Sequence, residues 1–146
     1  LGMSVAAYDP LLPADHPAWA GALRQALPEL LATSDVVSLH VPLTDATRDI
    51  IDTAAIATMK RGSILINAAR GGVVDEAALC AALRAGHLGG AALDVFAREP
   101  VDAVTGAAFA DVPNLVLTPH IAGVTDESNV RVSAVTAEAV ARHLDA

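Results

Sequence analysis

The 146-residue sequence has few aromatic, sulfur-containing and basic residues. Aromatic residues make up 3% of the chain, and Cys80 is its one cysteine, which excludes an internal disulfide framework and a zinc site built from cysteines. Nine Lys and Arg residues stand against 17 Asp and Glu residues, so a broad basic surface for nucleic acid is excluded. No apolar run reaches the roughly 20 residues of a bilayer span. The first residues also lack the basic start of a signal peptide.

The residues that are abundant indicate a protein with a hydrophobic core. Apolar residues make up 53% of the chain, and most are Ala, Val, Leu and Ile. A chain of this length can bury the core of one ordinary domain. We therefore expect a soluble, acidic, cytoplasmic α/β domain with neither nucleic acid nor a membrane as its partner.

Short apolar runs of four to six residues predict the strands. Their apolar residues are nearly continuous, which is typical of a parallel sheet covered on both faces. The predicted strands are Met3–Tyr8, Asp35–His40, Ser63–Asn67, Ala91–Phe96 and Asn114–Thr118.

Amphipathic stretches between these runs predict helices. The clearest helix should start from an N-cap at Asp75 and stop at Gly86, and the last should be capped by Thr125. The predicted helices cover residues 27–33, 53–59, 75–85 and 125–143. The alternation of strands and helices predicts right-handed βαβ units in a doubly wound parallel sheet. The longest irregular stretch, residues 98–112, is expected to be a functional loop.

Chemically versatile residues stand where five strands should end. In a doubly wound sheet, ligands bind outside the carboxyl ends of the strands. The residues at these positions are Asp9, His40, Arg70, Asp94 and His120. Asp9 is either a turn residue before Pro10 or an acceptor for the adenosine ribose of NAD, where its charge would repel the 2′-phosphate of NADP.

The glycine-rich fingerprint of a dinucleotide-binding loop, G-x-G-x-x-G, does not occur in the chain. Leu1, Gly2 and Met3 look like the end of a helix that leads into a strand. We therefore expect a Rossmann-like domain that lacks its first strand and its phosphate loop. Residues 1–146 would be a partial dinucleotide-binding domain.

Four blocks of the sequence stand out: Ser34–Thr44 followed by Thr47–Arg48, Met59–Asp75, Gly90–Phe96 followed by Glu99–Pro100, and Pro113–Gly123. In these residues the chain resembles the NAD-binding domain of the D-isomer-specific 2-hydroxyacid dehydrogenases, a family that includes the phosphoglycerate dehydrogenase-like enzymes. The blocks occur in the order and with the spacing of that family.

The resemblance implies three catalytic residues. Arg70 would bind the 2-oxo or carboxylate group of a small 2-oxo or 2-hydroxy acid, and a guanidinium can do so with two parallel hydrogen bonds. His120 would transfer the proton, and Glu99 would orient His120 and stabilise its charged form. Without the resemblance, these residues would be read as a surface arginine in a Gly-Gly turn, a histidine after Pro119 and a solvated Glu-Pro turn.

The resemblance also implies NAD as the cofactor and a set of residues that bind it. Asp94 would accept hydrogen bonds from the nicotinamide carboxamide, or else from nearby backbone N–H groups, because a buried carboxylate needs donors. The expected cofactor-binding residues are Asp9, Pro10, His40, Val41, Pro42, Thr47, Ala68, Ala69, Arg70, Asp94, His120 and Gly123. His16, His87 and His143 have no metal-ligand spacing, so we expect no metal.

Three functions remain possible at this point. The first is an NAD-dependent dehydrogenase that pairs as a homodimer through the cofactor domain. Its substrate domain would be absent from these residues, so that this chain alone would be inactive. The second is a non-catalytic NAD-sensing or protein-binding module of corepressor type, and the third is an inactive fragment. The set of Arg70, Glu99 and His120 favours the enzyme. The stretch from His120 to Ser133 resembles the sulfolactate dehydrogenase branch.

Overall fold

The computed structural model describes residues 2–144, so Leu1, part of the expected helix end, lies outside the described residues. The chain alternates short strands and helices. In chain order the elements are β1 (Ala6–Ala7), the 3-10 helix η1 (Pro17–Trp19), β2 (Leu23–Arg24), α1 (Leu27–Thr33), β3 (Val36–Leu39), α2 (Thr53–Thr58), β4 (Ile64–Asn67), α3 (Glu76–Arg84), β5 (Gly90–Leu93), α4 (Ala103–Ala107), β6 (Leu115–Leu117) and α5 (Asp126–Leu144).

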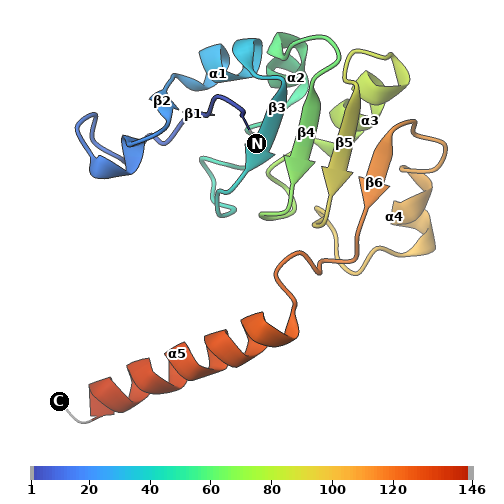
Figure 1. Cartoon of the computed structure of the whole chain (residues 1–146). Coiled ribbons are helices and arrows are strands. Elements are labelled where there is room, and N and C mark those ends of the chain that lie inside the picture. The colour runs from blue at the N-terminus through green and yellow to red at the C-terminus, as the bar shows by residue number, and fades with distance from the viewer. Residues whose placement is uncertain (1, 145–146) are drawn as a thin grey trace.

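The main sheet is parallel, and its strands follow one another in chain order, β3-β4-β5-β6 (Figure 1). Helices α2 and α3 connect consecutive strands, as in βαβ units. The parallel α/β class predicted from the sequence is therefore confirmed. Strands β1 and β2 form a separate two-stranded parallel sheet. Because the main strands run parallel, the carboxyl ends of all of them meet at one edge.

Helices α1, α2 and α3 lie together on one face of the main sheet (Figure 1). Side chains on that face form the core, and it includes Val37 and Leu65 from the strands and Leu79 from α3. Alternate residues point the other way: Val36 is 45% exposed and Ile64 is 41% exposed. Along these strands, buried and exposed side chains thus alternate. The nearly continuous apolar runs had predicted that both faces of the sheet are covered, so this prediction was wrong for the described residues.

Local capping explains where the helices begin. The Asp75 side chain accepts the Ala78 N–H at 3.0 Å, and Thr125 Oγ1 accepts the Ser128 N–H at 3.1 Å. Both N-caps confirm the predicted starts of α3 and α5. Gly86 follows α3 with a φ of +63°, a left-handed conformation that glycine adopts without strain.

Two local predictions were wrong, and two short elements were missed. The strand expected over Met3–Tyr8 is reduced to Ala6–Ala7, and its partner β2 was not anticipated because two residues carry no periodic pattern. The 3-10 helix η1 was also missed. The stretch 98–112 is not wholly irregular, since it contains α4, whose N-cap Asp102 accepts the Thr105 N–H at 2.8 Å. Gly106 inside α4 weakens the helical signal of this short segment.

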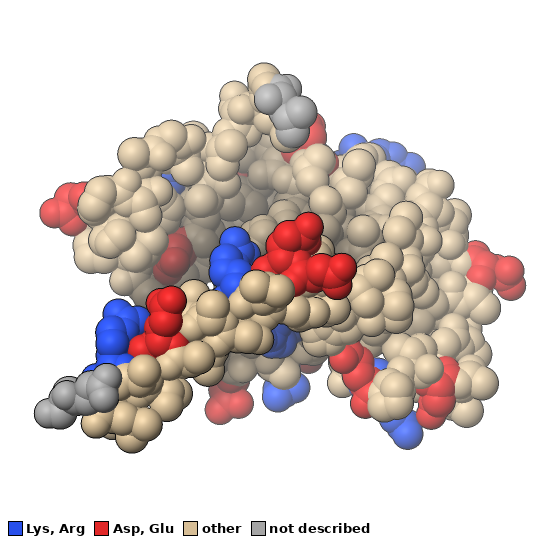
Figure 2. Space-filling view, turned by 60° about the horizontal axis from the view of Figure 1, so that its bottom comes forward, with Lys and Arg blue, Asp and Glu red and all other residues tan. Residues whose placement is uncertain are grey.

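The last helix, α5, runs away from the sheet and buries none of its residues (Figure 1). Figure 2 looks onto this helix, along which acidic and basic side chains alternate. Its first turn carries Asp126 and Glu127 and its last turn Arg142 and His143, an arrangement that the helix dipole favours. Val130 and Val135 are among its exposed apolar residues. Among residues 2–144, no helix combines the length and the apolar character needed to cross a membrane.

Candidate active site

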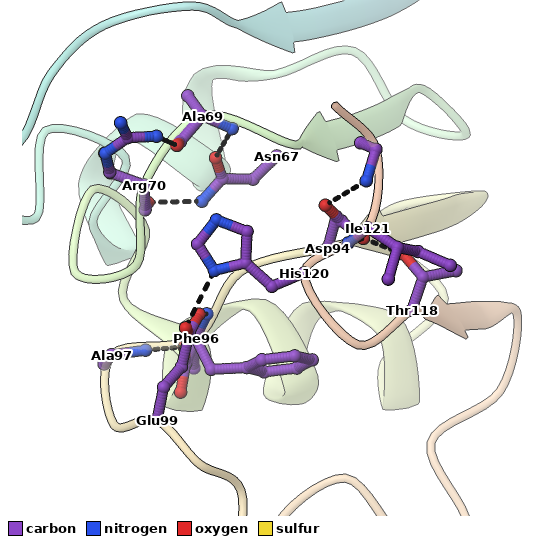
Figure 3. A network of polar contacts seen from close by, with 12 residues as sticks. Asn67, Ala69, Arg70, Asp94, Phe96, Ala97, Glu99, Thr118, His120 and Ile121 are labelled. Carbon is purple, nitrogen blue, oxygen red and sulfur yellow. Dashed lines mark hydrogen bonds and ion pairs between the residues drawn. The ribbon is translucent and has the colours of Figure 1, made fainter. Parts of the chain in front are cut away.

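Two side chains that the sequence analysis paired, those of His120 and Glu99, are in contact. His120 Nδ1 lies 2.8 Å from Glu99 Oε2, and Glu99 Oε1 accepts the Phe96 N–H at 2.9 Å (Figure 3). The hydrogen bond with His120, followed by the one from Phe96, lowers the pKa of the Glu99 carboxyl. The carboxylate is therefore ionised near neutral pH and is held from both sides.

The backbone around His120 is fixed by Asp94. His120 has a φ of 56°, a left-handed conformation that is uncommon for residues other than glycine. The next two residues donate their N–H groups to Asp94, Ile121 at 2.9 Å and Ala122 at 2.8 Å, and Thr118 Oγ1 donates to it as well. Asp94 thus ties the end of β5 to the loop that carries His120.

Asp94 is only 5% exposed, so its charge needs the donors it has. Burial raises the pKa of this carboxyl. The hydrogen bonds from Thr118, Ala122 and Ile121, together with His120, outweigh that effect and leave the pKa below its usual range. The structure thus contains the backbone donors that the sequence analysis offered as the alternative partner of Asp94. Thr118 was missed as a donor, although its position before Pro119 at the end of a strand could have signalled it.

The turn that carries Arg70 is held by Asn67, a residue that the sequence analysis did not single out. Asn67 is 2% exposed at the end of β4; its Nδ2 donates to the Arg70 carbonyl at 3.0 Å and its Oδ1 accepts the Ala69 N–H at 3.1 Å. A polar residue at the end of an otherwise apolar run was the available signal. The Arg70 guanidinium is exposed and donates to the Ala69 carbonyl at 2.6 Å. In Figure 3 the His120 ring turns its far edge toward this turn.

A pocket of about 300 Å³ opens at the ends of β3 and β4. Six of the predicted residues line it: His40, Val41, Pro42, Ala68, Ala69 and Arg70. Thr47 is not among them, but its Oγ1 donates to the Pro42 carbonyl at 2.6 Å and so holds the pocket wall. Glu99, His120, Asp94 and Gly123 also lie outside this lining.

A second pocket of about 300 Å³ is lined in part by Asp9 and Pro10. Its other lining residues are Tyr8, Arg24, Gln25, Ala26 and Glu29. Gln25 Oε1 is buried and has no hydrogen-bond partner within residues 2–144, while Asp9 Oδ1 accepts the Leu11 N–H at 2.8 Å. The pocket therefore offers the Asp9 carboxylate as an oxygen acceptor, which suits the hydroxyl groups of a nucleoside. Arg24 and Gln25 were not predicted from the sequence.

The described residues contain no group of three or more His, Cys, Asp or Glu side chains that could hold a metal ion. What the strand ends do carry is a guanidinium, a histidine–carboxylate pair and two pockets. Together with the parallel sheet, these features are typical of a nucleotide-binding α/β domain.

The chain belongs to the D-isomer specific 2-hydroxyacid dehydrogenases, because the model of that family's NAD binding domain matches residues 1–122. The (S)-sulfolactate dehydrogenase of Chromohalobacter salexigens is 56% identical over 145 residues, which are 99% of this chain and 46% of that protein. The glycerate dehydrogenase of Methylorubrum extorquens is 47% identical over 128 residues, 88% of this chain and 38% of that protein.

Solved structures support the same assignment. The D-lactate dehydrogenase of Aquifex aeolicus, complexed with NAD and lactic acid, matches with a TM-score of 0.83 and 36% identity, over 99% of this chain and 47% of that one. This chain thus spans less than half the length of the relatives named here.

Proposed function

We propose that these residues form the cofactor half of an NAD-dependent dehydrogenase that interconverts a small 2-hydroxy acid and its 2-oxo acid. The 2.8 Å contact between His120 Nδ1 and Glu99 Oε2 carries the proposal, because a histidine oriented by a carboxylate is suited to proton transfer. The coverage of the relatives supports a second, substrate-binding domain elsewhere in the active protein. The cleft between the two domains would be the catalytic site.

In this proposal Arg70 binds the substrate. Its guanidinium is exposed beside the pocket lined by His40 and Ala69, and it can form paired hydrogen bonds with the carboxylate or the 2-oxo group. The positive charge also stabilises the negative charge that develops on the carbonyl oxygen during reduction. In the structure Arg70 donates to Ala69, so substrate binding would exchange that contact for contacts with the carboxylate.

His120 is the proton donor in reduction and the acceptor in oxidation. Glu99 holds Nδ1, which leaves Nε2 as the atom that exchanges the proton with the substrate oxygen. The ionised Glu99 stabilises the imidazolium form that is needed to donate a proton. Asp94 acts on the same residue by fixing the backbone that follows it.

The pockets fit NAD, which supplies or accepts the hydride when it is bound. Asp9 would accept hydrogen bonds from the adenosine part, and its carboxylate disfavours a 2′-phosphate. His40, Val41, Pro42, Ala68 and Ala69 would line the remaining cleft, with Thr47 supporting its wall. Asp94, His120 and Gly123 would lie near the nicotinamide.

For the substrate, we propose sulfopyruvate and sulfolactate first, since a relative named (S)-sulfolactate dehydrogenase is 56% identical. Hydroxypyruvate and glyoxylate are the next candidates, in keeping with the similarity to a glycerate dehydrogenase. The proposal further includes a cytoplasmic location. It also includes a homodimer joined through this domain, and light scattering of the intact protein would test whether it is a dimer.

The test follows NADH absorbance while the intact protein, with its substrate domain, is mixed with a panel of 2-oxo acids. We expect oxidation of NADH with at least one of them, and preferentially with sulfopyruvate. Full turnover by a His120→Ala variant would contradict the proposed mechanism. Tight NADH binding without turnover of any 2-oxo acid would instead favour a cofactor-sensing module.

A further inference from the structure

The loop that carries Glu99 is held by a contact outside the proposed catalytic set. Glu76, the first residue of α3, accepts the Ala97 N–H through its Oε1 at 2.6 Å. The neighbouring Phe96 N–H is bound by Glu99 itself at 2.9 Å. Two carboxylates, one from α3 and one from the loop, therefore fix two consecutive N–H groups (Figure 3 shows Phe96, Ala97 and Glu99).

The same peptide unit touches the Arg70 turn from its other side. A Cβ placed on Gly71 would lie 1.7 Å from the Phe96 carbonyl oxygen, so this peptide lies directly against the glycine. Gly71 follows Arg70, and Glu76 stands five residues further along the same segment. The segment with the proposed substrate-binding arginine thus also fixes the loop with the carboxylate that contacts His120.

We propose that Glu76 is a positioning residue for the Glu99–His120 pair, because it anchors the Phe96–Ala97 peptide against the turn that carries Arg70. The inference rests on the proposed dehydrogenase function only where it predicts a change in kcat. Glu76 touches neither Glu99 nor His120 through a hydrogen bond and acts through the loop backbone. As an acidic residue in the first turn of α3, Glu76 would also favour the helix dipole, but that role does not require its contact with Ala97.

The surroundings of Glu76 disfavour its charged form, which indicates that its hydrogen bond compensates for an unfavourable position. Burial raises the pKa of its carboxyl; the Ala97 N–H counteracts this, and the nearby charges of Asp49, Asp75 and Glu99 raise the pKa again. A half-buried carboxylate near three other carboxylates is unfavourable unless a hydrogen bond compensates for its burial, and a side chain without an acceptor oxygen could not make that bond. The hydrogen bond from Ala97 provides that compensation.

The experiment compares Glu76→Ala, Glu76→Gln and Asp75→Asn in the intact protein. The alanine removes the acceptor, the glutamine keeps an oxygen that can accept the Ala97 N–H, and Asp75→Asn removes a neighbouring charge while keeping an N-cap. We expect Glu76→Ala to lower kcat by about tenfold with little change in the KM for NADH, because misplacement of a proton-transfer pair affects the chemical step. Glu76→Gln and Asp75→Asn should retain most of kcat.

A second readout does not depend on turnover. The hydrogen bonds from His120 and Phe96 lower the pKa of Glu99, so loosening the loop in Glu76→Ala should raise that pKa, measured by a carboxyl-carbon NMR titration, while Glu76→Gln leaves it low. Asp94 and His120, the other charged groups near Glu99, are the same in all variants. Equal kcat and equal Glu99 pKa in the alanine and glutamine variants would overturn the inference. If the wild type turns over no 2-oxo acid, the proposed function fails, and the titration alone decides the role of Glu76.

Discussion

Glu99 holds His120 with one carboxylate oxygen and its own loop with the other. Oε2 lies 2.8 Å from His120 Nδ1, and Oε1 accepts the Phe96 N–H at 2.9 Å. The carboxylate cannot rotate toward the solvent without breaking both contacts. The orientation of the imidazole therefore depends on the backbone geometry of residues 96–99 as much as on the charge of Glu99.

Replacement of His120 by alanine should reduce kcat about 100-fold or more, because general acid–base catalysis contributes factors of this size. The affinity for NADH should change much less. Steady-state rates with the best 2-oxo acid and a fluorescence titration with NADH measure the two effects separately. Glu99→Gln, which keeps the shape of the side chain, should give a smaller loss and a changed pH profile. Identical pH profiles of this variant and the wild type would contradict the role of Glu99.

Replacement of Arg70 by lysine should raise the KM for the 2-oxo acid by about tenfold or more, since an ammonium cannot reproduce the paired hydrogen bonds of a guanidinium. Arg61, which is exposed and follows α2, offers the matched control, Arg61→Lys. Equal KM values for the two variants would argue against carboxylate binding by Arg70.

Removal of the Asp9 carboxylate should weaken the preference for NADH over NADPH by about tenfold, because the charge no longer repels a 2′-phosphate. The ratio of kcat/KM for the two cofactors in Asp9→Ala is the measurement. Asp15→Ala loses the same charge at an exposed position in the same segment and should leave the ratio unchanged. A common shift in both variants would mean that net charge alone sets the preference.

Thr118→Val should destabilise the folded state by about 2 kcal/mol near neutral pH, because the buried Asp94 loses one donor. The pKa of Asp94 is lower in the folded than in the unfolded chain, so its contribution is fully present above the unfolded value. This contribution to stability is lost as the pH falls through the pKa of Asp94 in the folded state. The difference in unfolding free energy between variant and wild type should shrink in that pH range. Urea unfolding at several pH values measures this, with Thr58→Val as the control for loss of a hydroxyl that donates to a helix carbonyl.

Gly71→Ala should destabilise the protein by about 2 kcal/mol or more, since the new Cβ would overlap the Phe96 carbonyl oxygen and the backbone must move. Gly106→Ala is the opposite case. The nearest atom outside that helix lies 3.6 Å from the added Cβ, so alanine fits and should stabilise α4 by up to about 1 kcal/mol. Thermal unfolding of both variants tests the pair.

The sequence predicted the parts of the fold that depend on local patterns. Four of its five strands, both tested caps and the class of the sheet follow from apolar runs and capping residues. Strand β2 was missed because its two residues are ordered by pairing with β1, and that pairing is not visible in a local pattern. The sequence predicted that helices cover both faces of the sheet, but one face is partly exposed. An apolar run does not show which of its residues pack against a helix.

The site was predictable to the extent that it uses residues at strand ends. The sequence paired Glu99 with His120, and these side chains are in contact. Asn67 and Glu76 were not recognised, since their importance lies in hydrogen bonds to the backbone at other positions, Arg70 and Ala97. The Asn67 contact is local, and a polar residue at the end of an apolar run was its one signal. The Glu76 contact joins segments 21 residues apart, so no spacing along the chain predicts it.

The close approach of Gly71 to the Phe96 carbonyl also limits how the chain can change in length. The segment after Arg70 contacts the loop of Glu99 at two points, at Gly71 and again at Glu76. An insertion between these two contacts would push the segments apart or break one of the contacts. Residues 101–112, which are mostly exposed and lie beyond both contacts, should tolerate insertions and deletions better.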